Sequence, residues 1–159
     1  MIFLQKSLLF FLPAIFVCIR LQRILGVLIL LLNFSISMIV HREDREEDFD
    51  LWDYIDKLCI FIWILYNTYL VILVSSYLNK KWDLTIFILL LLSLIGVTLV
   101  YYFNIKRKEV GKWRSKEQDL VHGLMHISGG IGSLFLLLAI NKIKKHNLVS
   151  QVVSQVVSQ

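Results

Sequence analysis

The stretch LCIFIWILYNTYLVILVSSYL, Leu58 to Leu78, is a run of 21 residues without one charged side chain. An α-helix rises 1.5 Å per residue, so about 20 apolar residues span the roughly 30 Å of hydrocarbon in a bilayer. The length and the absence of charge therefore predict a transmembrane helix.

Four more apolar stretches flank the first one. They cover residues 1–19, 24–40, 84–103 and 120–140. We interpret the first of these as a span, kinked at Pro13, rather than as a signal peptide, because one Lys precedes its apolar part and no small-residue cleavage site follows. The expected fold is all-α: a polytopic transmembrane helix bundle of about five spans in residues 1–141, followed by a basic, low-complexity tail at 142–159.

Composition supports the same class. Of the 159 residues, 57% are hydrophobic and 18% are charged, and the mean hydropathy is +0.70, which lies outside ordinary globular usage. The formal net charge of +5 comes from basic residues clustered between apolar stretches, so it indicates membrane-flanking charge and no nucleic-acid partner. Cys18 and Cys59 both lie in apolar stretches and predict no disulfide framework.

The order of the spans sets the sidedness. Five spans place the N-terminus and the loops at 41–57 and 104–119 on one side, and the turns at 20–23 and 79–83 with the tail on the other. The first side carries ten Lys and Arg residues and the second seven, which favours a cytoplasmic first side. The sequence leaves open which membrane holds the protein.

The tail carries a short repeat. LVSQVVSQVVSQ, Leu148 to Gln159, contains a four-residue unit three times. Such a low-complexity pattern is typical of a disordered segment or of a frayed helical extension. We assign it no function.

Polar residues inside the spans are the candidate functional residues, because ionisable groups at membrane depth are costly and mark functional sites. His122 and His126 are four residues apart, so a helix presents both imidazoles on one face, as chelation of one ion requires. Asn33, Ser37 and His41 repeat that interval and predict a polar stripe on a second helix.

The predicted topology brings these groups together. His41 ends one span, Asp56 begins the next, and the histidine pair His122 and His126 begins the last, so all of them are expected at one side of the bilayer. Three histidines and a water form the ligand set of an open catalytic zinc site. Bound zinc lowers the pKa of that water to about 7 and makes hydroxide available.

Each signal also has an ordinary interpretation. The spacing of His122 and His126 suits hydrogen bonding between helices, and Asp56 alone suits a solvated acidic loop. We interpret the small residues from Ser128 to Ser133 as a close helix contact, and the aromatic residues as interface anchors and packing. The convergence of the three signals on one side favours the metal site.

These residues resemble a known family. The combination of S-x-x-x-H (Ser37, His41), an Asp opening the next span (Asp56) and H-x-x-x-H opening the last (His122, His126) resembles the CREST superfamily of membrane hydrolases, which includes alkaline ceramidases, adiponectin-receptor-like proteins and GPI-remodelling lipases. The resemblance covers residues 24–78 and 117–141. Within it, DLVHGLMHISGGIGSLFLLLA is most similar to the last helix of the GPI-remodelling phospholipase-like group.

The resemblance implies a function. It implies a zinc ion held by His41, His122 and His126, with Asp56 and Ser37 as catalytic residues beside the zinc-bound water, and hydrolysis of an amide or ester bond of a membrane lipid. The family usually has seven helices, and this chain is predicted to have five. A shortened bundle of this kind either completes itself as a homo-oligomer or has lost the activity.

Two other functions remain open at this point. One is a helix bundle that binds haem through histidine ligands, with His41 and one residue of the histidine pair on opposite faces of the haem. The other is a non-catalytic receptor or structural membrane protein that retains the metal site or uses its polar side chains for helix packing.

Overall fold

The computed structural model describes residues 7–40, 51–110 and 116–157. These residues form a 3-10 helix and five α-helices, with no strand in the described ranges, which confirms the all-α prediction. The helices are η1 (Leu8–Phe11), α2 (Leu12–Arg20), α3 (Ile24–Val40), α4 (Leu51–Lys80), α5 (Leu84–Val110) and α6 (Lys116–Val157). His41 and the acidic residues that follow it lie outside the described residues.

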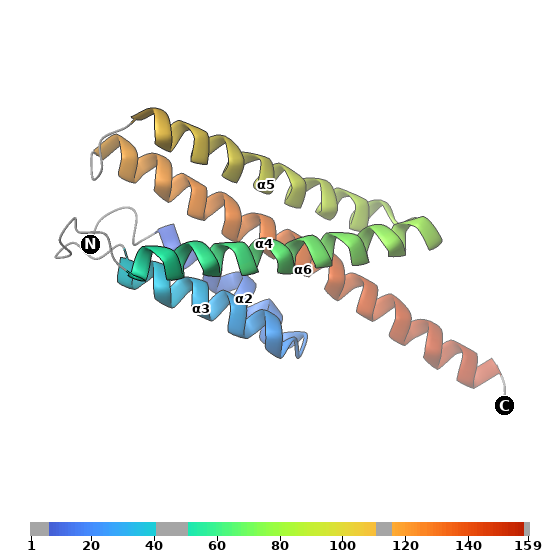
Figure 1. Cartoon of the computed structure of the whole chain (residues 1–159). Helices are drawn as coiled ribbons and strands as arrows, with labels where there is room; N and C mark the ends of the chain where they lie inside the picture. The colour runs from blue at the N-terminus through green and yellow to red at the C-terminus, as the bar shows by residue number, and fades with distance from the viewer. Residues whose placement is uncertain (1–6, 41–50, 111–115, 158–159) are drawn as a thin grey trace.

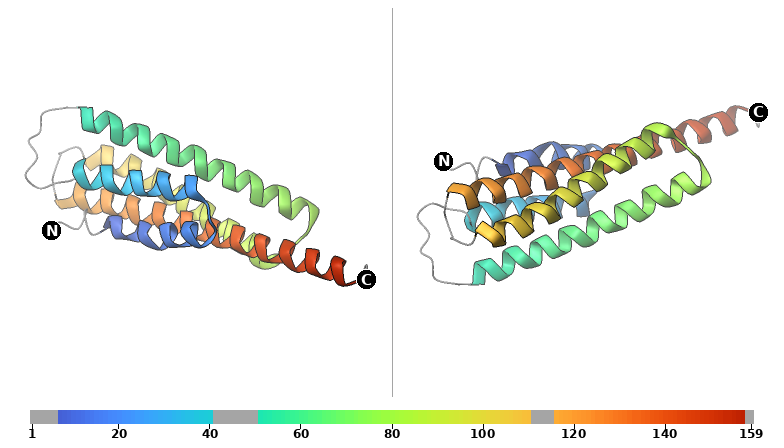
Figure 2. Two further views of the ribbon diagram at one scale, coloured as in Figure 1. Left: turned by 90° about the horizontal axis from the view of Figure 1, so that it is seen from below. Right: turned by 90° about the horizontal axis from the view of Figure 1, so that it is seen from above.

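The central helix of the bundle is α6, which contacts η1, α2, α4 and α5. It pairs along much of its length with α5, while α3 packs on α4 (Figure 1). The hairpin of α2 and α3 is shorter than the other helices and covers them over part of their length only, as the two views of Figure 2 show.

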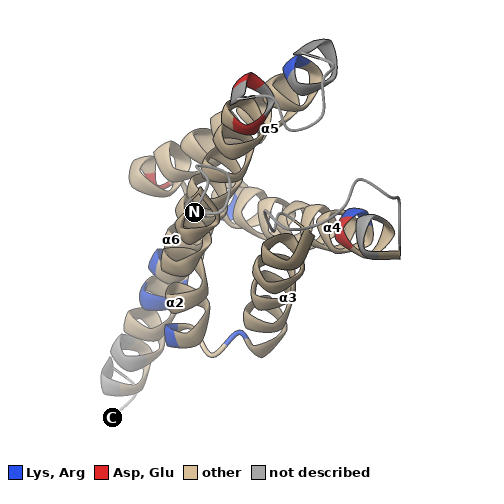
Figure 3. Ribbon diagram, turned by 90° about the vertical axis from the view of Figure 1, so that its left-hand side faces the viewer, with Lys and Arg blue, Asp and Glu red and all other residues tan. Residues whose placement is uncertain are grey.

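The helices have the surface expected of a protein in lipid. Three of them are long and apolar enough to cross a membrane, over Tyr54–Lys80, Leu84–Lys106 and Asp119–Gln151, and two shorter apolar helices cover Leu8–Arg20 and Ile24–Val40. Large apolar side chains are exposed along the bundle. In the described chain, charged residues lie near helix ends and turns and, as lysines, in the later part of α6 (Figure 3). Membrane association follows from this arrangement.

Helix boundaries agree with the predicted spans where a turn follows directly. α3 has the predicted bounds, and α5 begins at Leu84 as expected, but α4, α5 and α6 extend past the predicted ends at 58, 103 and 140. Hydropathy marks where a helix touches lipid, whereas backbone hydrogen bonding continues into water. The repeat in the tail is helical as far as Val157, so the helical alternative is correct for that part.

Pro13 lies at a change of helix type within the first predicted span. It lies in the first turn of α2, directly after the 3-10 turn of η1. Backbone N–H groups in a first turn have no partner within the helix, so the N–H that proline lacks costs nothing there. Pro13 therefore lies where the α-helix begins, and the expected kink stays a prediction.

The turn from α2 to α3 is a tight cap. The N–H of Gln22 donates to the carbonyl of Ile19 at 3.0 Å, and the N–H of Arg23 donates to that of Cys18 at 3.0 Å. These two bonds form a Schellman motif, whose left-handed position is occupied by Gln22 with φ 56°. The motif fixes the direction in which the chain leaves α2 at Arg23.

The small residues of α6 lie at helix contacts, as predicted. A Cβ on Gly96 of α5 would lie 2.8 Å from Cα of Gly132, and a Cβ on Gly130 would lie 2.6 Å from the carbonyl oxygen of Phe10. Only glycine permits these backbones to approach so closely. They set α5 and η1 directly against α6.

Candidate functional site

Ser37 and Asp56 join α3 to α4 at the end of the bundle where α4 and α6 begin, which we call the site end. The hydroxyl of Ser37 donates a hydrogen bond of 2.7 Å to Oδ1 of Asp56. Both side chains are buried, with 3% and 7% exposure. A buried carboxylate oriented by a hydroxyl is a group prepared for proton transfer or for holding a polar ligand.

His122 and His126 lie on one face of α6, as their spacing predicts. Their rings are stacked, with centroids 4.8 Å apart and planes inclined by 22°. Both are buried, at 4% and 6% exposure. The face is directed into the bundle, so two imidazoles are presented together away from bulk solvent.

Hydrogen bonds deeper in the bundle show that Asp56 and His126 lie at the same level. The indole Nε1 of Trp63 in α4 donates to Oγ of Ser133 in α6 at 3.1 Å. Asp56 precedes Trp63 by seven residues and His126 precedes Ser133 by seven, and α4 and α6 begin at the same end (Figure 1). Seven residues are two turns, about 10 Å, so both groups lie at matching depth.

A ladder of polar side chains holds α3, α4 and α6 in this register. Nδ2 of Asn33 donates to the carbonyls of Ile29 and Cys59, at 3.0 Å each, and so ties α3 to α4. Asn67 lies three turns beyond Asp56 in α4, and its Oδ1 accepts a hydrogen bond from Ser133 of α6 at 3.1 Å. In lipid such bonds also satisfy groups that would otherwise be buried without a partner.

Phe11 forms an apolar wall beside the site, which sequence reasoning missed. Its ring lies edge-on to both neighbours, with centroids 6.4 Å from His126 and 6.2 Å from Trp63. Phe11 itself is 6% exposed. The apolar stretch at 1–19 contained no signal that separated Phe11 from Phe10, since only the helix contact at Gly130 turns one of them inward.

The described donor atoms fit part of a metal site. No group of three His, Cys, Asp or Glu side chains able to hold a metal is found within residues 7–40, 51–110 and 116–157. The histidine pair supplies two nitrogen ligands of the kind zinc prefers. The third predicted ligand, His41, lies outside the described residues and directly follows Val40, the last residue of α3, which is buried.

No family model, no curated protein and no solved structure matches the chain. The resemblance of its polar motifs to the CREST superfamily therefore stays a prediction.

Proposed function

We propose that the protein is a membrane-embedded, zinc-dependent hydrolase that cleaves an amide or ester bond of a lipid. The observation that carries the proposal is the buried Ser37–Asp56 hydrogen bond at the level of the buried, stacked histidine pair. The site predicted from residue order alone needs those four residues at one depth. A helix bundle that only packs its polar groups has no such need.

Each residue has a role in this proposal. His122, His126 and His41 would hold the zinc, which would supply Lewis-acid chemistry to a lipid carbonyl and to a water. Asp56 would accept a proton at a carboxylate oxygen from the water whose oxygen adds to the carbonyl carbon, and would deliver it to the amine or alcohol that leaves as the amide or ester bond breaks. Ser37 keeps the carboxylate oriented through its bond to Oδ1, and Phe11 excludes bulk water from the histidine pair.

The membrane arrangement belongs to the same proposal. The chain crosses the bilayer several times, with the site end on the cytoplasmic side, as the ten basic residues against seven favour. α3 is 17 residues long, about 26 Å, and spans a locally thinned bilayer. A lipid substrate reaches the site from within the membrane, and a second copy of the chain supplies the walls that five helices lack.

The test is hydrolysis by the purified, detergent-solubilised chain. Release of fatty acid from ceramide and from a phospholipid is measured before and after zinc is removed with a chelator, and again after zinc is restored. The proposal predicts activity that falls on chelation and returns with zinc, in protein without a Soret absorption band. A Soret band with stoichiometric haem, or release that is indifferent to the chelator, would contradict it.

A further inference from the structure

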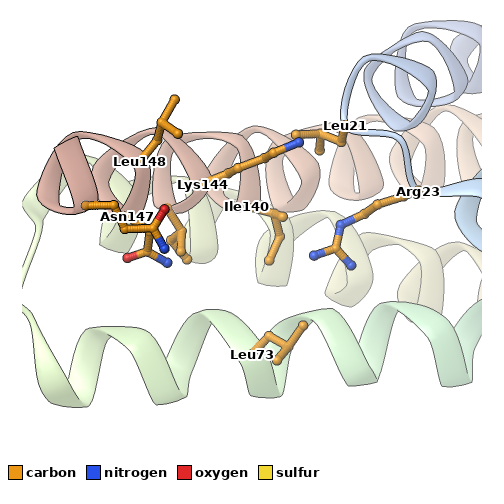
Figure 4. Close-up of a pocket in the computed structure, with 9 residues that line it drawn as sticks. Leu21, Arg23, Leu73, Ile140, Lys144, Asn147 and Leu148 are labelled. Atoms are coloured by element: carbon orange, nitrogen blue, oxygen red, sulfur yellow. The ribbon is translucent and has the colours of Figure 1, made fainter. Parts of the chain in front are cut away.

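A cavity of about 570 Å³ lies away from the site end, between the α2–α3 turn, α4 and the later part of α6 (Figure 4). This volume falls within the roughly 300–1,000 Å³ of typical ligand pockets. The proposed hydrolase uses none of the residues around it. The cavity is therefore a candidate for a second, separate binding site.

The short α2–α3 hairpin creates the cavity. α2 ends at Arg20 and α3 begins at Ile24, whereas α4 and α6 continue for several turns past this level (Figure 2). Beyond the α2–α3 turn, the hairpin therefore no longer covers the facing sides of α4 and α6. In Figure 4, Leu73 of α4 and Ile140 of α6 point toward one another across that space.

Two cations line the cavity beside these apolar walls. Arg23 extends its guanidinium from the turn toward α4, and Lys144 extends its ammonium from α6 toward the turn (Figure 4). The lining residues of the described chain include no Asp or Glu. The nearby Asp83 accepts from Lys142 at 3.0 Å, so its charge is already paired with another lysine.

The protein is strongly basic in the region around the cavity. Seven Lys and Arg residues lie in the two turns and the tail on this side, against one acidic residue, Asp83. Arg23 is also held in place, because the Schellman bonds fix its backbone. An arginine and a lysine that line one cavity can both donate hydrogen bonds to phosphate oxygens.

We infer that the cavity binds an anionic phospholipid, with the phosphate between Arg23 and Lys144 and an acyl chain along Leu73 and Ile140. The apolar walls favour a lipid over free phosphate, since a cavity for an inorganic anion needs no hydrocarbon surface. Charge in the headgroup region and apolar area at acyl depth match one amphiphile.

The experiment uses the full chain in neutral detergent, with phosphatidylglycerol adducts counted by native mass spectrometry and phosphatidylcholine as the neutral reference. The variant Arg23→Gln/Lys144→Gln is compared with Arg20→Gln/Lys145→Gln. The second pair removes the same charge from the same turn and helix, but neither residue lines the cavity. We expect the cavity pair to lower phosphatidylglycerol retention by about tenfold or more, and the control pair by less than about twofold.

A third variant, Leu73→Trp, keeps both cations and fills the apolar part. It should lower phosphatidylglycerol retention while leaving the helix content by circular dichroism unchanged. Equal losses in the two double variants would show a general surface-charge effect and overturn the inference. So would full retention in the cavity pair or in Leu73→Trp, or displacement of the lipid by millimolar inorganic phosphate. Zinc content plays no part in these readouts, so the inference stands or fails separately from the hydrolase proposal.

Discussion

Two aspartates, one near each end of α4, have different surroundings. Asp56, in the second turn, is buried and accepts a hydrogen bond from the hydroxyl of Ser37. Asp83, three residues past the last turn, accepts from the backbone N–H of Ile86 at 2.9 Å and from Lys142 at 3.0 Å. One carboxylate lies within the bundle, and the other caps α5 and pairs with a lysine at its edge.

The surroundings of Asp83 also contain a histidine and a hydroxyl. Nε2 of His146 lies 3.6 Å from Oδ2 of Asp83, and the hydroxyl of Tyr77 is hydrogen-bonded to Nδ1 of His146 at 2.9 Å. An aspartate, a histidine and a hydroxyl group are also found in the candidate site, where the hydroxyl belongs to a serine. Here they lie at a partly exposed junction of α4, α5 and α6. The carboxylate of Asp83 is already bound by Lys142 and by the backbone N–H of Ile86 in the first turn of α5. Residue types alone therefore do not define the site; burial and a second imidazole on the same face do.

The largest expected effect separates the two aspartates by activity. Asp56→Asn keeps the size of the side chain but cannot accept the proton, so lipid hydrolysis should fall by about 10²-fold or more. Asp83→Asn should leave the rate within about twofold, because its interactions are structural. Fatty-acid release by both variants, at equal protein and zinc, measures this. Equal losses would remove the distinction between the two ends.

The second-largest expected effect is a loss of stability when the helix packing near the site end is disturbed. Gly130→Ala places a methyl group against the backbone of Phe10, which cannot move aside as a side chain can, so η1 and the ring of Phe11 must shift from His126. Such overpacking costs about 1–3 kcal/mol. Chemical unfolding in detergent measures the loss.

Gly132→Ala is the matched control for Gly130→Ala. Its new Cβ would lie 3.3 Å from the carbonyl oxygen of Ser93, so it requires a smaller adjustment and should destabilise the protein less. Unfolding of both variants at the same denaturant concentration would contradict the close approach of η1 to α6.

A smaller effect concerns pH at Asp83. The N–H of Ile86 and then Lys142 lower the pKa of this carboxyl below its ordinary value of 3.8. A lowered pKa in the folded state adds stability that is present above the ordinary pKa and is lost as the pH falls through the lowered one. The Asp83→Asn variant should therefore unfold at a slightly lower denaturant concentration than wild type at pH 7. The two unfolding curves should converge in acid, and a gap that widens there would contradict this account.

The smallest effect lies in the α2–α3 turn. Gln22 holds a left-handed conformation that glycine adopts without strain, so Gln22→Gly should stabilise the protein by about 0.5 kcal/mol. Gln22→Ala gains no such relief and serves as the control. Thermal unfolding of the two variants measures the difference, and a glycine variant less stable than the alanine variant would contradict the turn geometry.

Much of the fold follows from local sequence, and the reasons are physical. The bounds of α3 and the start of α5 were predictable because a polar turn interrupts an apolar run beside each. The extension of α6 to Val157 was not predictable, because the helix propensities of Val, Ser and Gln do not by themselves determine whether such a repeat is helical. The face shared by His122 and His126 was predictable from their spacing, since the helical period fixes it.

Contacts that depend on tertiary packing could not be predicted from the sequence. The partner of Ser37 and the wall made by Phe11 arise from how helices meet, which hydropathy does not encode. The cavity beside Arg23 and Lys144 was missed for a related reason: as flanking charges they resemble every other membrane-flanking cation. The cavity exists because α4 and α6 continue past the α2–α3 turn, and the apolar stretches, which are of similar length, did not show this.

The most direct test of the central claim is the zinc content of the purified chain, measured by mass spectrometry of the metal. We predict about one zinc per chain in wild type, loss of most of it in His122→Ala and in His126→Ala, and wild-type content in His146→Ala, whose histidine lies near Asp83. Wild-type protein without zinc, or equal loss in His146→Ala, would contradict the proposed metal site.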